Sequence, residues 1–215
     1  MKEDILEQIA DDWFLSNDTT FTKHNVKFKP HESDEEYIPK LDSSYSDIDV
    51  LAVHLNKSGV NRVSAASCKS WQSGFNPKQT MNYLLNNPYK KVNGREIWKA
   101  FRELINKKWG KAYSRKIYEE TANKEFTYYL FVTKIVGNKN EDLEKSKSEF
   151  QACKTFINNL KYDDDSKVKI KLVDVRELFM SHYLKSQSTT LASTELGRLI
   201  QVIKASGIKF NEEIV

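Results

Sequence analysis

Hydrophobic residues recur along the chain in both helical and strand periods, which predicts a mixed α/β fold. Residues 3–16 repeat apolar positions at i and i+4, as one face of a helix does. Residues 46–54, SDIDVLAVH, and 60–70, VNRVSAASCKS, are β-rich runs separated by the turn signal NKSG. We therefore expect a helix near the start of the chain and a β-hairpin over 46–70.

The rest of the chain continues to alternate between the two periods. The sequence predicts further strands at 20–29, 126–136 and 167–174, and a loop at 30–45. It predicts helices at 77–87, 94–123 (two basic helices with a break near Gly110), 139–161, 175–186 and 192–206. This order predicts a central mixed sheet flanked by helices. We expect one domain over 1–215, with a basic helical insertion at about 89–125.

Composition narrows the class of protein. Hydrophobic residues make up 39% and charged residues 30% of the chain, enough for a core and a well-solvated surface. No run of about 18 apolar residues occurs, and the acidic N-terminus, MKEDILEQIADDWF, is unlike a secretory signal. Two cysteines form no disulfide framework, and the four histidines lack zinc-ligand spacing. We expect a cytoplasmic protein that does not associate with a membrane.

The charges are unevenly distributed along the chain. Residues 1–60 contain 13 acidic side chains against 6 lysines, whereas residues 89–125 contain 11 basic side chains against 5 glutamates. Segregation of this kind favours two surfaces with different partners. A basic surface could contact a polyanion, and an acidic site could hold a cation.

The predicted hairpin brings polar side chains together. A turn centred near Lys57 and Ser58 makes the numbers of paired positions add up to about 115 or 116. Because side chains alternate between faces, one face then carries Asp47, Asp49, Ser67 and Lys69. The opposite face would be apolar, formed by Ile48, Val50, Ala52 and Cys68.

Phosphodiester hydrolysis requires such a set of side chains. Carboxylates hold Mg²⁺, which neutralises the phosphate and activates water, and a lysine stabilises the developing negative charge. The residues alone leave another interpretation open, because an Asp-x-Asp pair and a single strand lysine are often no more than a solvated face.

Residues 46–53, SDIDVLAV, and 64–71, SAASCKSW, resemble the core motif of the PD-(D/E)XK nucleases, particularly the Mrr-like and restriction-endonuclease-like branches. There an Asp in a D-V-L-A strand is followed by E-C-K-S on the next strand. The resemblance implies a restriction-endonuclease-like core and Mg²⁺- or Mn²⁺-dependent hydrolysis of DNA. It implies that Asp49 binds the metal, that Lys69 is catalytic, and that the Cys68 backbone carbonyl is a further ligand.

Ser67 departs from the family pattern, which has Glu or Asp at this position. Serine supplies no charge, so a metal ligand is missing. Asp47 is one substitute, because it shares a face with Asp49. Glu7 is another, because many relatives carry a Glu on the first helix, although a helical wheel places Glu3 nearer the edge of the apolar stripe.

Basic and aromatic residues interleave over residues 89–125, a pattern typical of nucleic-acid binding. Its aromatics also follow helical spacing, so they could belong to the core instead. Gln72, just past the lysine motif, is a further candidate for contacting the phosphate or metal-bound water. The candidate DNA contacts are Lys90, Lys91, Arg95, Lys99, Arg102, Lys107, Lys108, Lys111, Arg115 and Lys116.

We therefore expect a Mg²⁺-dependent endonuclease acting on DNA, related to restriction or defence. Cutters of both strands commonly dimerise to present two sites, so a homodimer would suit this function, but the sequence leaves the oligomeric state open. Ser67 motivates an alternative, a non-catalytic DNA-binding or assembly protein that retains the nuclease fold. An unrelated α/β enzyme with a fortuitous hairpin is a third hypothesis.

Overall fold

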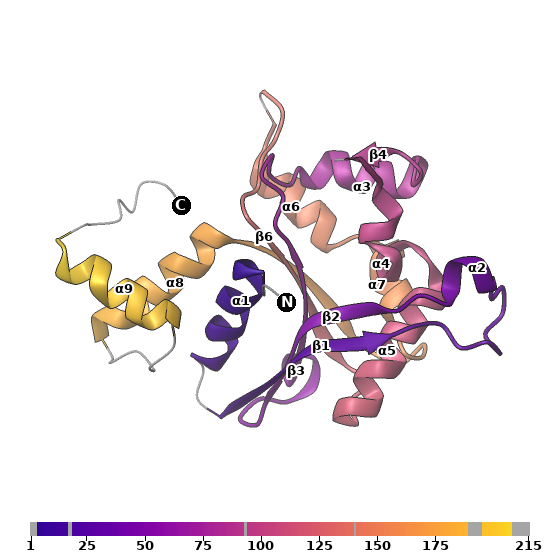
Figure 1. Cartoon of the computed structure of the whole chain (residues 1–215), viewed down its shortest axis with the longest axis horizontal. Coiled ribbons are helices and arrows are strands. Elements are labelled where there is room, and N and C mark those ends of the chain that lie inside the picture. The colour runs from indigo at the N-terminus through magenta and orange to yellow at the C-terminus, as the bar shows by residue number, and fades with distance from the viewer. Residues whose placement is uncertain (1–3, 17–18, 93, 140, 189–194, 208–215) are drawn as a thin grey trace.

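A five-stranded mixed sheet of order β1-β2-β3-β6-β7 forms the centre of the computed structural model (Figure 1), which describes residues 4–16, 19–92, 94–139, 141–188 and 195–207. Three strands are antiparallel: β1 (Thr20–Phe28), β2 (Ser46–His54) and β3 (Val63–Lys69). The other two continue parallel to β3: β6 (Phe126–Val132) and β7 (Val168–Asp174). The predicted α/β class with a central mixed sheet is confirmed.

Helices cover both faces of the sheet (Figure 1). One side carries α1 (Ile5–Leu15), α8 (Val175–Ser188) and α9 (Glu195–Ala205). The other carries α3 (Pro77–Asn86), α4 (Arg102–Ile105), α5 (Lys107–Thr121), α6 (Leu143–Gln151) and α7 (Lys154–Leu160). The shorter elements are α2 (Pro39–Asp42), the hairpin strands β4 (Lys91–Val92) and β5 (Arg95–Glu96), and the 3₁₀ turns η1 (Gly59–Asn61) and η2 (Ile97–Ala100). None of the helices described is long and apolar enough to cross a membrane.

The predicted hairpin register is confirmed. Val50 pairs with Ala66 and Leu51 with Ala65, so the numbers of paired positions add up to 116. The ladder between β2 and β3 ends at the Val50–Ala66 pair. Asp49 therefore lies where the two strands begin to separate, with room for a side chain between them.

The prediction that Ile48 lies on the same face of the sheet as Val50, Ala52 and Cys68 is wrong. Val50, Ala52 and Cys68 pack against α1, but Ile48 packs in the core on the opposite side of the sheet. Asn25 of β1 has a φ of 50°, and the β1–β2 ladder skips it. The side chains on either side of Asn25 also face opposite sides of the sheet, since His24 lies 3.1 Å from Asp11 of α1 and Val26 packs in the same core as Ile48.

The predicted break near Gly110 is also wrong, because α5 runs through this position without interruption. The break lies at Asn106, whose side chain accepts hydrogen bonds from the backbone N–H groups of Lys108 and Trp109 and so caps α5. An added Cβ on Gly110 would lie 2.1 Å from the carbonyl oxygen of Asn159 in α7. Glycine here serves close packing, not a turn.

Two other predicted boundaries differ from the structure. The helix expected over 139–161 is divided into α6 and α7, and the strand expected over 126–136 ends at Val132. The segment 89–125 begins as a hairpin and a 3₁₀ turn rather than as a helix. Its apolar side chains, including Phe101, Trp109 and Tyr113, belong to the main core, so this segment is an integral part of the domain.

Candidate active site

A cavity of about 310 Å³ opens where β2 and β3 separate. The hairpin contributes one wall, and residues 92–103 contribute the other. The four polar side chains that the register placed together all line it: Asp47, Asp49, Ser67 and Lys69. The structure therefore brings together the residues on which the family resemblance depends.

Asp49 is buried, with 9% of its surface exposed. Its Oδ2 accepts a hydrogen bond from the backbone N–H of Cys68 at 2.5 Å. The carboxylate thus bridges the two strands beyond the end of their ladder. Burial raises the pKa of Asp49, and attraction to Lys69 opposes that rise. A carboxylate in this state gains from any further cation in the cavity.

Lys69 reaches into the cavity from the end of β3. Its Nζ donates a hydrogen bond to the Ser67 hydroxyl at 2.8 Å and lies 5.9 Å from the centre of the Phe101 ring. Ser67 therefore orients the lysine through a neutral acceptor.

Asp47 lies at the edge of the same cavity, and its carboxylate is already engaged. Its Oδ2 lies 2.7 Å from Lys27 Nζ on the neighbouring strand β1. This ion pair is substantially exposed, so it is weak and open to competition. Lys27 competes with any cation for Oδ2 of Asp47.

Glu7 of α1 lies close enough to the hairpin carboxylates to be repelled by them. Burial, together with repulsion from Asp49, Asp4 and Asp47, raises its pKa to about 7. Glu7 is not among the side chains that line the cavity. Glu3, the alternative on the same helix, lies outside the described residues.

Two other candidates have clear positions. The Cys68 side chain packs in the core beneath α1, and burial raises its thiol pKa, so this side chain is no metal ligand in its thiol form. Gln72 is exposed in the turn after β3 and does not line the cavity.

A further carboxylate, Glu103 of α4, lines the cavity and was not predicted from the sequence. It is 5% exposed, and its Oε1 accepts a hydrogen bond from the Tyr128 hydroxyl at 2.7 Å. Ser67 lines the same cavity as Glu103. Glu103 therefore brings a second buried carboxylate to the cavity that Asp49 and Ser67 line.

One sequence signal could have identified Glu103. Glu103 lies next to Leu104 and two residues after Phe101, and both of these apolar residues belong to the core. An acidic side chain beside core positions is rarely buried unless it has a partner. Glu96, the first acid downstream of Lys69, lines the cavity too, but its carboxylate is held by Lys99 at 2.8 Å.

The ten basic candidates fall into two groups. Those exposed to solvent are Lys90, Lys91, Arg95, Lys99, Lys107 and Lys111, and those half-buried are Arg102, Lys108, Arg115 and Lys116. Arg95 and Lys99 line the cavity itself. Lys116 is ion-paired with Glu119 and Glu120 of its own helix.

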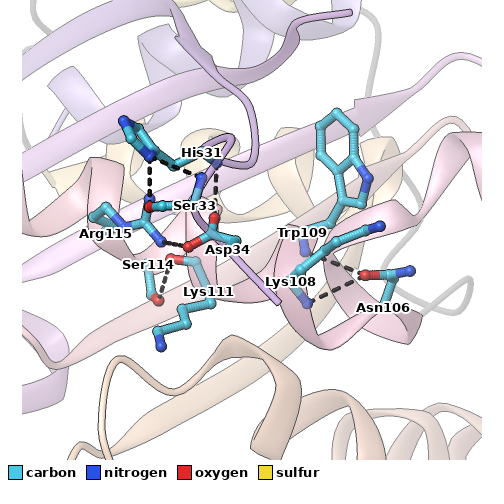
Figure 2. Close-up of polar contacts among 9 residues, drawn as sticks. All are labelled: His31, Ser33, Asp34, Asn106, Lys108, Trp109, Lys111, Ser114 and Arg115. Atoms are coloured by element: carbon cyan, nitrogen blue, oxygen red, sulfur yellow. Dashed lines mark hydrogen bonds and ion pairs between the residues drawn. The ribbon is translucent and has the colours of Figure 1, made fainter. Parts of the chain in front are cut away.

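An acidic loop, residues 31–42, packs against α5 and forms ion pairs with two of these basic side chains. Figure 2 shows Asp34 directed at Arg115, with 2.7 Å between Oδ1 and Nη2. Lys108 pairs with the buried Asp42 at 2.6 Å. Arg115 and Lys108 therefore hold residues 31–42 in place, and these two are poorly available to a polyanion.

The described residues contain no group of three or more His, Cys, Asp or Glu side chains placed to hold one metal ion. A metal at the cavity would instead need a mixed set of oxygen donors. Asp49 and Glu103 are two buried carboxylates that line the cavity, and hard oxygen donors suit Mg²⁺. Cys68, whose main-chain carbonyl the resemblance implies as a further ligand, is not among the lining residues. Mg²⁺ usually keeps several waters, so a small number of protein ligands is sufficient.

Comparisons with protein-family models, with curated proteins and with solved structures each found no match for this chain.

Proposed function

We propose that this protein is a metal-dependent nuclease that hydrolyses phosphodiester bonds of DNA. One observation carries the proposal: the buried carboxylate of Asp49 and the ammonium group of Lys69 face one cavity, at the point where two adjacent strands separate. This combination of side chains on a diverging hairpin is what the resemblance to PD-(D/E)XK nucleases requires.

Each side chain has a role that follows from its environment. Asp49 and Glu103 would hold Mg²⁺ or Mn²⁺, with the Cys68 carbonyl as a further donor. When bound, the ion would neutralise charge on the scissile phosphate and lower the pKa of a bound water. Lys69 stabilises the negative charge that develops on the phosphate. Ser67 fixes the Lys69 ammonium group by accepting its hydrogen bond.

Glu103 would replace the acid that is missing at position 67. It reaches from α4 into the cavity that Ser67 lines, and it accepts a hydrogen bond from the Tyr128 hydroxyl. The tyrosine hydroxyl donates to the carboxylate and so keeps it in one orientation. A helix from the segment 89–125 thereby completes a site that the hairpin alone leaves one ligand short.

The experiment that tests this proposal compares purified wild-type protein with Asp49→Asn. The DNA is offered in linear and circular forms, each single-stranded and double-stranded. We expect cleavage of DNA with Mg²⁺ or Mn²⁺, none with EDTA, and none by Asp49→Asn in any metal. Asp165→Asn changes an exposed aspartate in the turn before β7 and should cut as the wild type does. Cleavage retained by Asp49→Asn would contradict the proposal.

The alternative is a DNA-binding protein without catalysis. The neutral Ser67 and the ion pairs that hold Asp47 and Glu96 favour it, because they leave fewer free carboxylates. The same preparation distinguishes the two functions. DNA binding that is equal with and without Mg²⁺, with no product after long incubation, would support the alternative.

A further inference from the structure

Two of the most exposed aromatic side chains in the described residues lie beside the walls of the cavity. Tyr45 is 61% exposed and directly precedes Ser46, which lines the cavity. Tyr89 is 70% exposed and directly precedes Lys90, whose carbonyl accepts the backbone N–H of the lining residue Ile97 at 2.9 Å. Both tyrosine rings present most of their surface to solvent.

Cations accompany these rings. Lys29 Nζ lies 5.0 Å from the centre of the Tyr45 ring. The centre of the Trp98 ring lies 6.5 Å from that of the Tyr89 ring, in an edge-on arrangement. Lys99 Nζ lies 5.7 Å from the centre of the Trp98 ring. Aromatic and basic groups therefore alternate on both sides of the cavity.

Arg102 connects the two sides. Its guanidinium lies 5.5 Å from the centre of the Trp98 ring, and its Nη1 donates to the Ser44 hydroxyl at 3.3 Å. Ser44 is next to Tyr45 in the chain. We name this set the aromatic rim, formed by Lys29, Tyr45, Tyr89, Trp98, Lys99 and Arg102.

We propose that the aromatic rim binds unpaired nucleotides, so that the substrate of the proposed nuclease site is single-stranded DNA. In a regular duplex the bases are stacked on one another, and their π faces are closed to protein side chains. An unpaired base offers that face, and stacking on an aromatic ring contributes about 1–3 kcal/mol per base whatever its sequence. The neighbouring cations contact the backbone phosphates.

The charges around the rings favour this partner over a protein. An exposed aromatic pair that served an apolar protein interface would be surrounded by apolar side chains. Here Lys90, Lys91 and Arg95 are exposed next to the rim. A flexible anionic polymer with aromatic bases matches both components of the surface. The inference deepens the proposed function, since the rim surrounds the proposed catalytic cavity.

The test measures equilibrium binding of labelled DNA in metal-free buffer, at one fixed salt concentration, so that no cleavage occurs. We expect wild-type protein to bind oligothymidylate more tightly than a duplex of the same length. Tyr45→Ala and Tyr89→Ala should each weaken binding to oligothymidylate by about 5- to 150-fold, which corresponds to the loss of one stacked base. Tyr89→Phe, which keeps the ring, should bind as the wild type does.

Phe21→Ala is the matched control. Phe21 is 65% exposed and pairs with Val53, at the end of β2 away from Asp47. Equal or tighter binding of the duplex, or tyrosine variants no weaker than Phe21→Ala, would overturn the proposal. Binding with the expected pattern but no Mg²⁺-dependent cleavage would overturn only the nuclease function. Cleavage that requires Asp49 but binding that ignores both tyrosines would overturn only this inference.

Discussion

At the scale of single residues, some side chains that line the cavity could be predicted from the sequence and others could not. Asp49, Ser67 and Lys69 were placed together by strand alternation and hairpin register alone, because those depend only on local sequence. Glu103 was not, because its position depends on how α4 packs against the sheet, and no periodicity of the hairpin contains that information. Ile48 shows the same limit, since its side chain packs in the core on the opposite side of the sheet from that of Val50.

Replacing Glu103 by Gln should lower the rate of Mg²⁺-dependent cleavage by at least about 10- to 100-fold, the range for losing a group that supports a metal site. The reaction should also need more Mg²⁺ to reach half its maximal rate. Gln keeps an oxygen that can accept from Tyr128, so the fold should survive. Glu96→Gln is the control, because Glu96 shares the cavity but is held by Lys99. Equal effects of both variants on the cleavage rate would show that Glu103 has no special role in the site.

Glu7 gives a prediction about pH. Its pKa rises from 4.5 to about 7 on folding, so the folded state holds the proton more tightly than the unfolded state. The stability that this group contributes is present below about pH 4.5 and is lost as the pH rises through about 7. Without divalent metal, Glu7→Gln should therefore melt at a higher temperature than wild type at about pH 8, and this difference should shrink as the pH falls and vanish below about pH 4.

Glu149→Gln controls for the loss of a charge, because Glu149 is exposed on α6. Thermal melts of the three proteins at both pH values are the measurement. A Glu7→Gln variant no more stable than wild type at the higher pH would show that Glu7 is not crowded by the hairpin carboxylates.

At the scale of secondary structure, the positions of most elements could be predicted and several of their boundaries could not. Helix and strand periods located α1, β2, β3, α3 and β7 to within a few residues. The segment 89–125 was less predictable because its glycine and its apolar residues serve tertiary packing. Gly110 suggested a break by its low helix propensity, whereas the structure uses it to let α5 approach α7.

Gly110→Ala tests this packing. On an open helix the change would stabilise the protein by about 1 kcal/mol. Here the new Cβ would lie 2.1 Å from the Asn159 carbonyl oxygen and 2.8 Å from that of Glu103, both backbone atoms. We expect the overpacked variant to be destabilised by about 1–3 kcal/mol in urea unfolding. Cleavage should fall as well, because α4 carries Glu103. A variant as stable as wild type would contradict the packing shown here.

At the scale of the whole molecule, the acidic and basic segments of the chain partly neutralise each other. Asp34 and Asp42 of the first segment pair with Arg115 and Lys108 of the second. The separation of acidic and basic residues along the sequence therefore suggests a larger basic surface than the folded protein has, because some of the basic side chains are ion-paired. Lys107 and Lys111 share a cavity with Asp34, Glu35 and Glu36, whereas Lys90 and Lys91 lie beside the candidate active site.

DNA binding should therefore depend on one lysine pair more than the other. Changing Lys90 and Lys91 together to Glu should weaken binding strongly. It should also reduce the slope of log K against log salt by about 1.4–1.8, as expected for two lost phosphate contacts. The same change at Lys107 and Lys111 should have a smaller effect, because the acidic loop already opposes these charges. Titrations at several salt concentrations measure both slopes, and a larger effect at Lys107 and Lys111 would reverse this assignment.

The most direct test of the nuclease assignment is the single-turnover rate of Mg²⁺-dependent DNA cleavage by wild type and Lys69→Ala, measured side by side. Circular dichroism would show that both are folded, and Lys167→Ala, at an exposed position before β7, controls for the loss of a lysine. We predict that Lys69→Ala binds DNA but cuts it at least about 100-fold more slowly, as expected when a group that stabilises developing charge is removed, and that Lys167→Ala cuts normally. Cleavage by Lys69→Ala at the wild-type rate would show that the cavity between β2 and β3 is not the active site.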